Sequence, residues 1–194
     1  MGEADKLMTL FTKGKGKIKA VAKGARRTTS KFGGRLEPFC YNHMMLASAK
    51  TLDIISQVET LESFYRIRET REKLNAGFYM LGLIDIMTEE RQENDALFDL
   101  LLAALRSLDS KQDTELIARA FEVNICEAEG LMPSDKMLSS KYAKLPRIVE
   151  KLRGGILKQD ASISEKDLEV CGKVFRMIIS DHVNRDIRGL RKFI

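Results

Sequence analysis

Polar and apolar residues alternate with a period of two in much of the first sixty residues, which is typical of β-strands with one buried face. The stretch from Lys6 to Thr12 is rich in β-forming residues, and lysines alternate with apolar residues from Lys17 to Lys23. Residues 13–16 separate these runs and contain two glycines, which predicts a hairpin turn. A second strand pair, joined by a short turn, is predicted at residues 39–47 and 52–59.

The spacing of apolar residues changes to three, four and seven from about Leu61, and this spacing predicts amphipathic helices. Later helices are expected to begin at residues whose side chains can accept hydrogen bonds from the free N–H groups of the first turn, or at a proline. The predicted starts are Asn94 or Asp95, Asp113 or Thr114, Pro146, and Ser162 or Ser164. Gly130 and the pair at residues 154–155 are predicted to end two of these helices.

The two patterns together predict an α+β fold with two domains. Four short strands and a long connecting loop fit an N-terminal OB-fold-like small β-barrel at residues 1–60, which we expect to bind nucleic acid. Residues 61–194 are predicted to form an all-α helical domain, without internal repeats.

Positive charge is concentrated at the N-terminal end of the chain. The 194 residues include 33 Lys/Arg and 28 Asp/Glu, which gives a net charge of +5. Residues 1–35 contain ten Lys/Arg and two acidic residues, whereas the other 159 residues contain 23 basic and 26 acidic residues. This asymmetry indicates an anionic partner for the N-terminal domain, and a well-solvated basic surface is the alternative.

The sequence shows little that could support catalysis or metal binding. Gly14-Lys15-Gly16-Lys17 lacks the pattern of a nucleotide-phosphate loop. Side chains that often bind metals are present, but none has a second ligand at metal spacing: Cys40, Cys126, Cys171, His43 and His182. We therefore expect no enzyme, no cofactor and no metal site. With no secretory signal and no apolar run of membrane-spanning length, a cytoplasmic protein is predicted.

Lysines on a strand face, followed by a basic loop, can follow a phosphate backbone electrostatically without reading its sequence. The predicted DNA contacts are the basic residues of the hairpin turn, the second strand and the loop after it, with one aromatic residue: Lys13, Lys15, Lys17, Lys19, Lys23, Arg26, Arg27, Lys31, Phe32 and Arg35. Phe32 lies among charged loop residues and is the predicted base-stacking platform, whereas Phe11 and Phe39 are expected in the barrel core.

Several stretches of the sequence resemble the RecO family of bacterial DNA repair proteins. The resemblance is carried by GEADKLMTLFT at residues 2–12, GKIKAVAKGARR at 16–27, LEPF at 36–39, LESF at 61–64, DALFDLLL at 95–102, FE at 121–122 and LRKFI at 190–194. The run KGARR at residues 23–27 is its most specific part.

The resemblance implies a recombination mediator in which an OB-fold precedes a helical domain and which binds and anneals single-stranded DNA. It also implies partners, because the family acts with RecR to promote the loading of RecA onto DNA covered by single-stranded-DNA-binding protein (SSB). Matched position by position, the DNA contacts would be Lys17, Lys19, Lys23, Arg26, Arg27, Lys31 and Arg35.

Two departures from the family pattern affect what is expected. Many members carry a four-cysteine zinc module after the segment matching residues 121–133, and this chain has no cysteine pair there, so zinc is not expected. The family also has a strand before residues 2–5, so either the start of this sequence was assigned late or the first OB-fold strand is missing. Two other functions stay open: a protein-interaction adaptor that uses the helical domain, and an RNA-binding OB-fold protein.

Overall fold

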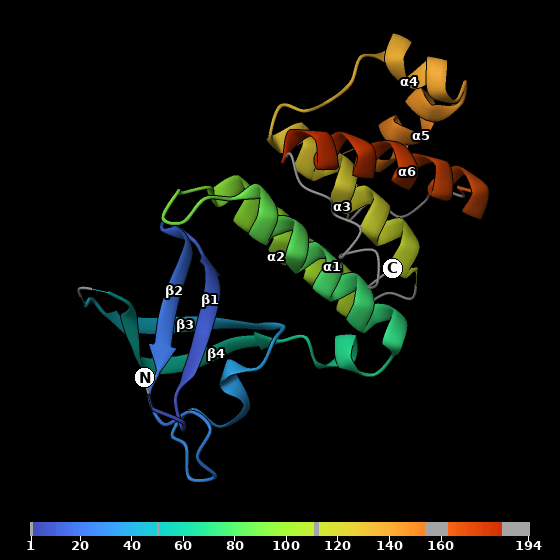
Figure 1. Cartoon of the computed structure of the whole chain (residues 1–194). Helices are drawn as coiled ribbons and strands as arrows, with labels where there is room; N and C mark the ends of the chain where they lie inside the picture. Colours follow the sequence, from blue (N-terminus) through green and yellow to red (C-terminus); the bar gives the residue numbers. More distant parts are fainter. Residues whose placement is uncertain (1, 50, 111–112, 154–162, 184–194) are drawn as a thin grey trace. The chain divides into compact units, whose positions relative to one another are not determined.

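The computed structural model describes residues 2–49, 51–110, 113–153 and 163–183 (Figure 1). The chain divides into two compact units, and each is described by itself. The first unit contains Met1–Tyr65 and Thr88–Phe98, and the second contains Arg66–Met87 and Asp99–Ile194. The sheet-containing unit therefore extends past residue 60 and includes a segment from the helical part of the sequence.

The first unit contains the four predicted strands. They are β1 (Lys6–Thr12), β2 (Gly16–Ala22), β3 (Cys40–Ala47) and β4 (Asp53–Ser63), and a 3-10 helix, η1 (Gly33–Leu36), precedes β3. The strand predictions are confirmed, except that β4 continues to Ser63, past the point at which a helix was expected. Leu61 is 51% exposed on this strand, so it is an apolar residue on a solvent-facing side.

The strands form one sheet in the order β1-β2-β4-β3. β1 and β2 pair along their whole length in an antiparallel hairpin, whereas β2 pairs in parallel with β4 only at Ala20 with Asp53 and Val21 with Ile54. β3 and β4 pair in antiparallel orientation and form a two-stranded ribbon. Their pairing has two register shifts, and such irregularities bend a ribbon. Figure 1 shows the β1–β2 hairpin and the β3–β4 ribbon running in crossing directions. This is the predicted OB-like arrangement, followed in the sequence by helices.

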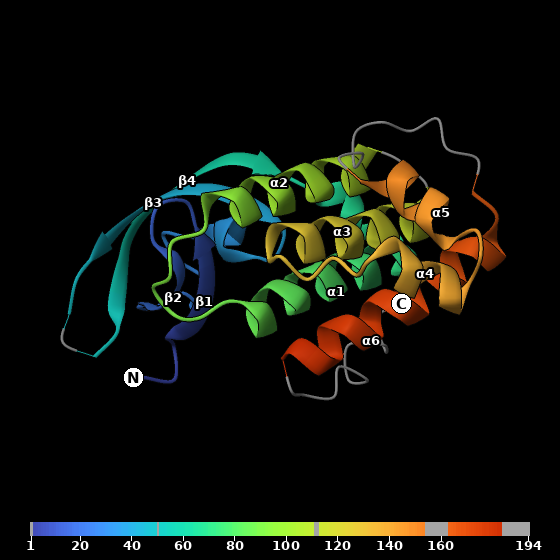
Figure 2. The same cartoon turned by 90° about the horizontal axis from the view of Figure 1, so that it is seen from above.

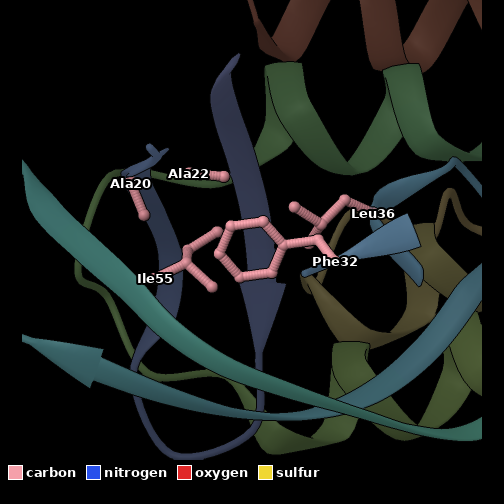
Figure 3. Close-up of a cluster of buried hydrophobic side chains, with 5 residues drawn as sticks. All are labelled: Ala20, Ala22, Phe32, Leu36 and Ile55. Carbon is pink, nitrogen blue, oxygen red and sulfur yellow. The ribbon is translucent and has the colours of Figure 1, made fainter. Parts of the chain in front are cut away.

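The core of the first unit lies on one face of this sheet. Figure 3 shows its most buried part, which consists of Ala20, Ala22, Phe32, Leu36 and Ile55. The two alanines are on β2 and leave space above the strand, which the ring of Phe32 occupies. Lys17 and Lys19 point to the opposite face because side chains alternate along a strand. The predicted strand with one buried and one charged face is confirmed.

The second unit is helical. Its described elements, two of which begin in the first unit (η2 and α2), are η2 (Tyr65–Arg68), α1 (Arg71–Met87), α2 (Asp95–Ser110), α3 (Thr114–Ala128), α4 (Asp135–Lys141), α5 (Leu145–Leu152) and α6 (Glu165–His182). α3 packs against α1, α5 and α6. Figure 2 shows α1, α3 and the greater part of α2 running alongside one another.

Side-chain caps fix the start of three helices, as predicted. The side chains of Asn94, Asp113 and Ser164 accept hydrogen bonds from the backbone N–H groups of the residues three positions later, at 3.0, 2.9 and 3.2 Å. Pro146 lies in the first turn of α5, also as predicted. The helix α4 was not expected from the sequence. Residues 154–155 and the basic end 184–194 lie outside the described residues.

Candidate nucleic-acid interface

The turn between β1 and β2 presents the first two predicted contacts. Lys13 and Lys15 are both exposed, and Gly14 between them has a φ of 76°, which a residue with a side chain rarely adopts. The N–H of Gly14 donates a hydrogen bond to Oδ1 of Asp95 at 2.7 Å. The tip of the hairpin therefore carries two basic side chains and lies beside the carboxylate of Asp95.

On β2, the structure places a carboxylate beside the predicted phosphate contacts. Lys19 is exposed and forms an ion pair with Glu90, and Lys17 is half-buried. The hydrogen bond from Lys19, together with the charges of Lys17 and Arg91, lowers the pKa of the Glu90 carboxyl. Glu90 is therefore ionised at neutral pH and balances part of the positive charge of β2.

The loop after β2 is built around the carboxylate of Asp5. Its two oxygens accept hydrogen bonds from the N–H groups of Gly24 at 2.9 Å and Gly2 at 2.7 Å, and these bonds lower the pKa of Asp5. The N–H of Arg26 donates to the carbonyl oxygen of Ala4 at 2.9 Å. These contacts fix the backbone of the loop while the side chains of Lys23, Arg26 and Arg27 are exposed.

Two further basic residues lie where this loop returns to the sheet. Nζ of Lys31 donates to the carbonyl oxygen of Ser56 on β4 at 2.8 Å and lies 5.1 Å from the centre of the Phe32 ring. Nη1 of Arg35 donates to the carbonyl oxygen of Lys31 at 3.2 Å. Both side chains remain exposed although their charged ends donate to backbone carbonyl oxygens, so each charge is held in place and is still in contact with solvent.

Phe32 does not have the position that base stacking requires. The side chain is only 2% exposed and belongs to the core cluster under β2, so the prediction of a stacking platform at Phe32 is wrong. Phe39 is 5% exposed, as expected for a core residue. Phe11 and Tyr41 are half-buried. Their ring centres lie 6.1 and 5.9 Å from that of Phe98, a residue of α2 that was not predicted to belong to the barrel.

The predicted basic residues form two groups, one in the β1–β2 turn and the first half of β2 and the other in the loop that follows β2; Figure 1 shows this turn and this loop at opposite ends of the strand. Six residue steps at ~3.3 Å separate Gly16 from Ala22, so the turn and the loop are about 20 Å apart, while Lys19 and Lys23 are about 13 Å apart. The loop group consists of Lys23, Arg26, Arg27, Lys31 and Arg35, and the hairpin group consists of Lys13, Lys15, Lys17 and Lys19. Glu90 and Asp95 approach the hairpin group and Asp5 lies at the base of the loop group, but only in the hairpin group does a carboxylate form an ion pair with one of the predicted basic side chains in the interactions described above, Lys19 with Glu90.

The described residues show little other chemistry. They contain no group of three or more His, Cys, Asp or Glu side chains that could hold a metal ion. Burial raises the pKa of Cys126 and Cys171 to about 12, so both are thiols rather than thiolates at neutral pH. A search of the described helices finds none with the length and apolar character needed to cross a bilayer.

Comparison with known proteins gives matches along most of the chain. The family model of the recombination protein O N terminal matches residues 1–64, and that of the recombination protein O C terminal matches residues 68–134. The DNA repair protein RecO of Alkaliphilus metalliredigens is 41% identical over 133 residues, which are 68% of this chain and 54% of that protein.

Two other relatives give the same result over longer alignments. RecO of Dehalococcoides mccartyi is 35% identical over 144 residues, which are 74% of this chain and 57% of the relative. RecO of Desulforamulus reducens is 35% identical over 169 residues, which are 86% of this chain and 66% of the relative. The chain thus spans between about half and two thirds of the length of these relatives.

Proposed function

This chain belongs to the RecO family of DNA repair proteins, and from this premise we propose that it is a recombination mediator that binds and anneals single-stranded DNA. Its role is to bind rather than to catalyse. With RecR it promotes the loading of RecA onto DNA covered by SSB, in the bacterial cytoplasm. The observation that supports DNA binding most directly is the loop group, five exposed basic side chains on a loop whose backbone is fixed by hydrogen bonds.

The loop group suits a phosphate backbone for two physical reasons. Long exposed Lys and Arg side chains reach phosphates at varied positions, and the release of counterions on binding makes this attraction favourable without regard to base sequence. The backbone of the loop is already ordered by Asp5, so little conformational entropy is lost when the DNA binds. A binding surface of this kind brings two strands close enough to anneal when each is held by its phosphates.

Salt dependence of binding tests this proposal. We expect the logarithm of the affinity for a fluorescent oligo(dT) to fall linearly with the logarithm of salt concentration, by roughly 0.7 for each phosphate neutralised. Replacement of Lys23, Arg26 and Arg27 together by Gln should make the slope shallower by about 2. The same loss of charge on exposed helix residues, Lys136→Gln, Lys141→Gln and Lys151→Gln, is the matched control and should leave the slope nearly unchanged.

The outcomes distinguish this function from its alternatives. Equal slopes for the two triple variants would exclude the loop group as the DNA site. Clearly tighter binding of an RNA oligomer than of a DNA oligomer of equal length would favour an RNA-binding protein, whereas phosphate contacts alone would bind the two equally. Capture of RecR or SSB without any DNA binding by the unsubstituted chain would favour the interaction adaptor.

A further inference from the structure

A short acidic segment between α1 and α2 lies along the first half of β2. We name residues 89–93 (Glu-Glu-Arg-Gln-Glu) the acidic strap. Glu90 pairs in parallel with Lys17, and the N–H of Arg91 donates to the carbonyl oxygen of Lys17 at 2.8 Å. The strap therefore occupies the edge of β2 in the half that lies before its pairing with β4.

The backbone of the strap is held in this position by two further contacts. Gly16 is so close to the strap that a Cβ atom at this position would overlap the carbonyl oxygen of Gln92. Nη2 of Arg91 lies 3.2 Å from Oδ2 of Asp53, a residue that is only 6% exposed at the start of β4. These contacts involve backbone and a buried carboxylate, so they do not depend on the ion pair of Glu90.

The ion pair between Lys19 and Glu90, in contrast, is open to solvent. Both side chains are about half exposed. Ion pairs at such positions contribute little to stability, because water screens both charges. A phosphate group approaching Lys19 could therefore replace the carboxylate at small cost. The charge of Glu90 would then be left without Lys19 and would repel the phosphate chain.

We propose that Glu90 is an internal competitor of the nucleic-acid phosphate at Lys19. Binding of a phosphate chain to β2 exchanges the carboxylate for a phosphate at Lys19, while the backbone of the strap stays on β2. The carboxylate thereby lowers the affinity of the hairpin group and confines tight binding to the loop group. This inference rests on the proposed binding of single-stranded DNA.

The test compares two neighbouring acidic residues in the full chain. Glu90→Gln removes the carboxylate beside Lys19, and Glu89→Gln removes an equal charge from an exposed residue for which the described chain shows no ion pair. We expect Glu90→Gln to bind oligo(dT) roughly two- to fivefold more tightly at low salt, with a nearly unchanged salt slope, because Lys19 contacts a phosphate in both proteins but loses a carboxylate only in the unsubstituted chain. Glu89→Gln should show a smaller gain and an unchanged slope.

A second substitution shows whether the gain acts through Lys19. In Lys19→Gln the additional replacement Glu90→Gln should give no such gain, because no cation remains at position 19 for which a carboxylate and a phosphate could compete. Nuclear magnetic resonance of the unsubstituted chain gives a measurement that does not depend on folding of a variant. On titration with oligo(dT), the amide signal of Glu90 should shift, while the amide of Arg91 remains protected from hydrogen exchange by its bond to Lys17.

The possible results separate this inference from the proposed function. Equal effects of Glu90→Gln and Glu89→Gln, with normal DNA binding by the unsubstituted chain, would overturn the competition and leave the proposed function intact. An unshifted Glu90 amide at saturating oligo(dT) would overturn it as well. A chain that does not bind oligo(dT) at any salt concentration would overturn both.

Discussion

Arg119 and Glu122, three residues apart on α3, form an ion pair in which neither side chain is exposed to solvent: Nη1 of Arg119 lies 2.9 Å from Oε1 of Glu122. The hydroxyl of Tyr79 on α1 donates to the same carboxylate oxygen, and Nη1 of Arg176 on α6 lies 3.5 Å from it. A Cβ atom on Gly172 of α6 would overlap Nη1 of Arg119, so a larger residue at this position would displace the guanidinium group from its place beside α6. The pair joins three helices of the second unit.

Loss of one partner of this pair should destabilise the helical unit strongly. Arg119→Met removes the nearest cation of the buried Glu122 carboxylate and leaves only Arg176, at 3.5 Å, so we expect a loss of up to about 3–5 kcal/mol, the cost of removing one partner of a buried pair. Urea denaturation followed by circular dichroism measures the loss. Glu115→Gln, which removes the 45% exposed partner of Arg119, is the control and should cost less than about 1 kcal/mol. Equal losses of unfolding free energy in the two variants would show that the buried pair with Glu122 stabilises the unit no more than the exposed pair with Glu115 does.

The stability of the helical unit should also depend on pH. Burial outweighs the attraction of Arg119 and raises the pKa of Glu122 from 4.5 to about 7. Between these two values the folded chain binds a proton that the unfolded chain has released, so stability should fall as pH rises from about 4.5 to 7 and level off above 7. Thermal unfolding midpoints of the unsubstituted chain and of Glu122→Gln, measured from pH 5 to 8, test this. Parallel curves for the two proteins would exclude Glu122 as the source.

Two glycines of the β1–β2 turn should differ in their tolerance of alanine. Gly14 and Gly16 both have positive φ, at 76° and 63°, so alanine costs about 1–2 kcal/mol at either position from backbone strain. Only at Gly16 would the new Cβ also meet the backbone of Gln92. Gly16→Ala should therefore lower the free energy of unfolding by clearly more than Gly14→Ala, which serves as its control. Equal losses in urea denaturation would show that the strap does not pack against Gly16.

Local sequence patterns were sufficient to predict the strands and most helix starts. The alternation of lysine with apolar residues in β2 reflects a strand with one buried face, and a capping residue such as Asp113 makes its hydrogen bond within its own helix. Such signals lie within a few residues of the structure that they determine. The end of β4 was predicted less well, because the exposed Leu61 resembles the first apolar residue of a helix.

The parts that the sequence did not reveal depend on contacts between distant residues. Glu90 reaches Lys19 across about seventy positions, and neither neighbourhood contains a signal for the pairing. The helix α4 buries only Leu138, so its apolar spacing is too sparse to recognise. Phe32 is surrounded by charged neighbours in the sequence, which suggested exposure. The structure instead folds the loop back over the two small alanines of β2.

Substitution of Phe32 should affect stability rather than DNA binding. Because the ring is 2% exposed, Phe32→Ala leaves a cavity in the core of the first unit and should cost about 3–5 kcal/mol in urea denaturation. Phe32→Leu retains most of the buried volume and should cost less.

The same variant tests whether the ring contacts DNA. A ring that stacks on bases contributes ~1–3 kcal/mol per base to binding, so its removal would weaken the affinity by about fivefold or more. At a temperature where Phe32→Leu is fully folded, we expect its affinity for oligo(dT) to equal that of the unsubstituted chain. A fivefold weaker affinity with an unchanged circular dichroism spectrum would mean that the ring leaves the core to contact DNA.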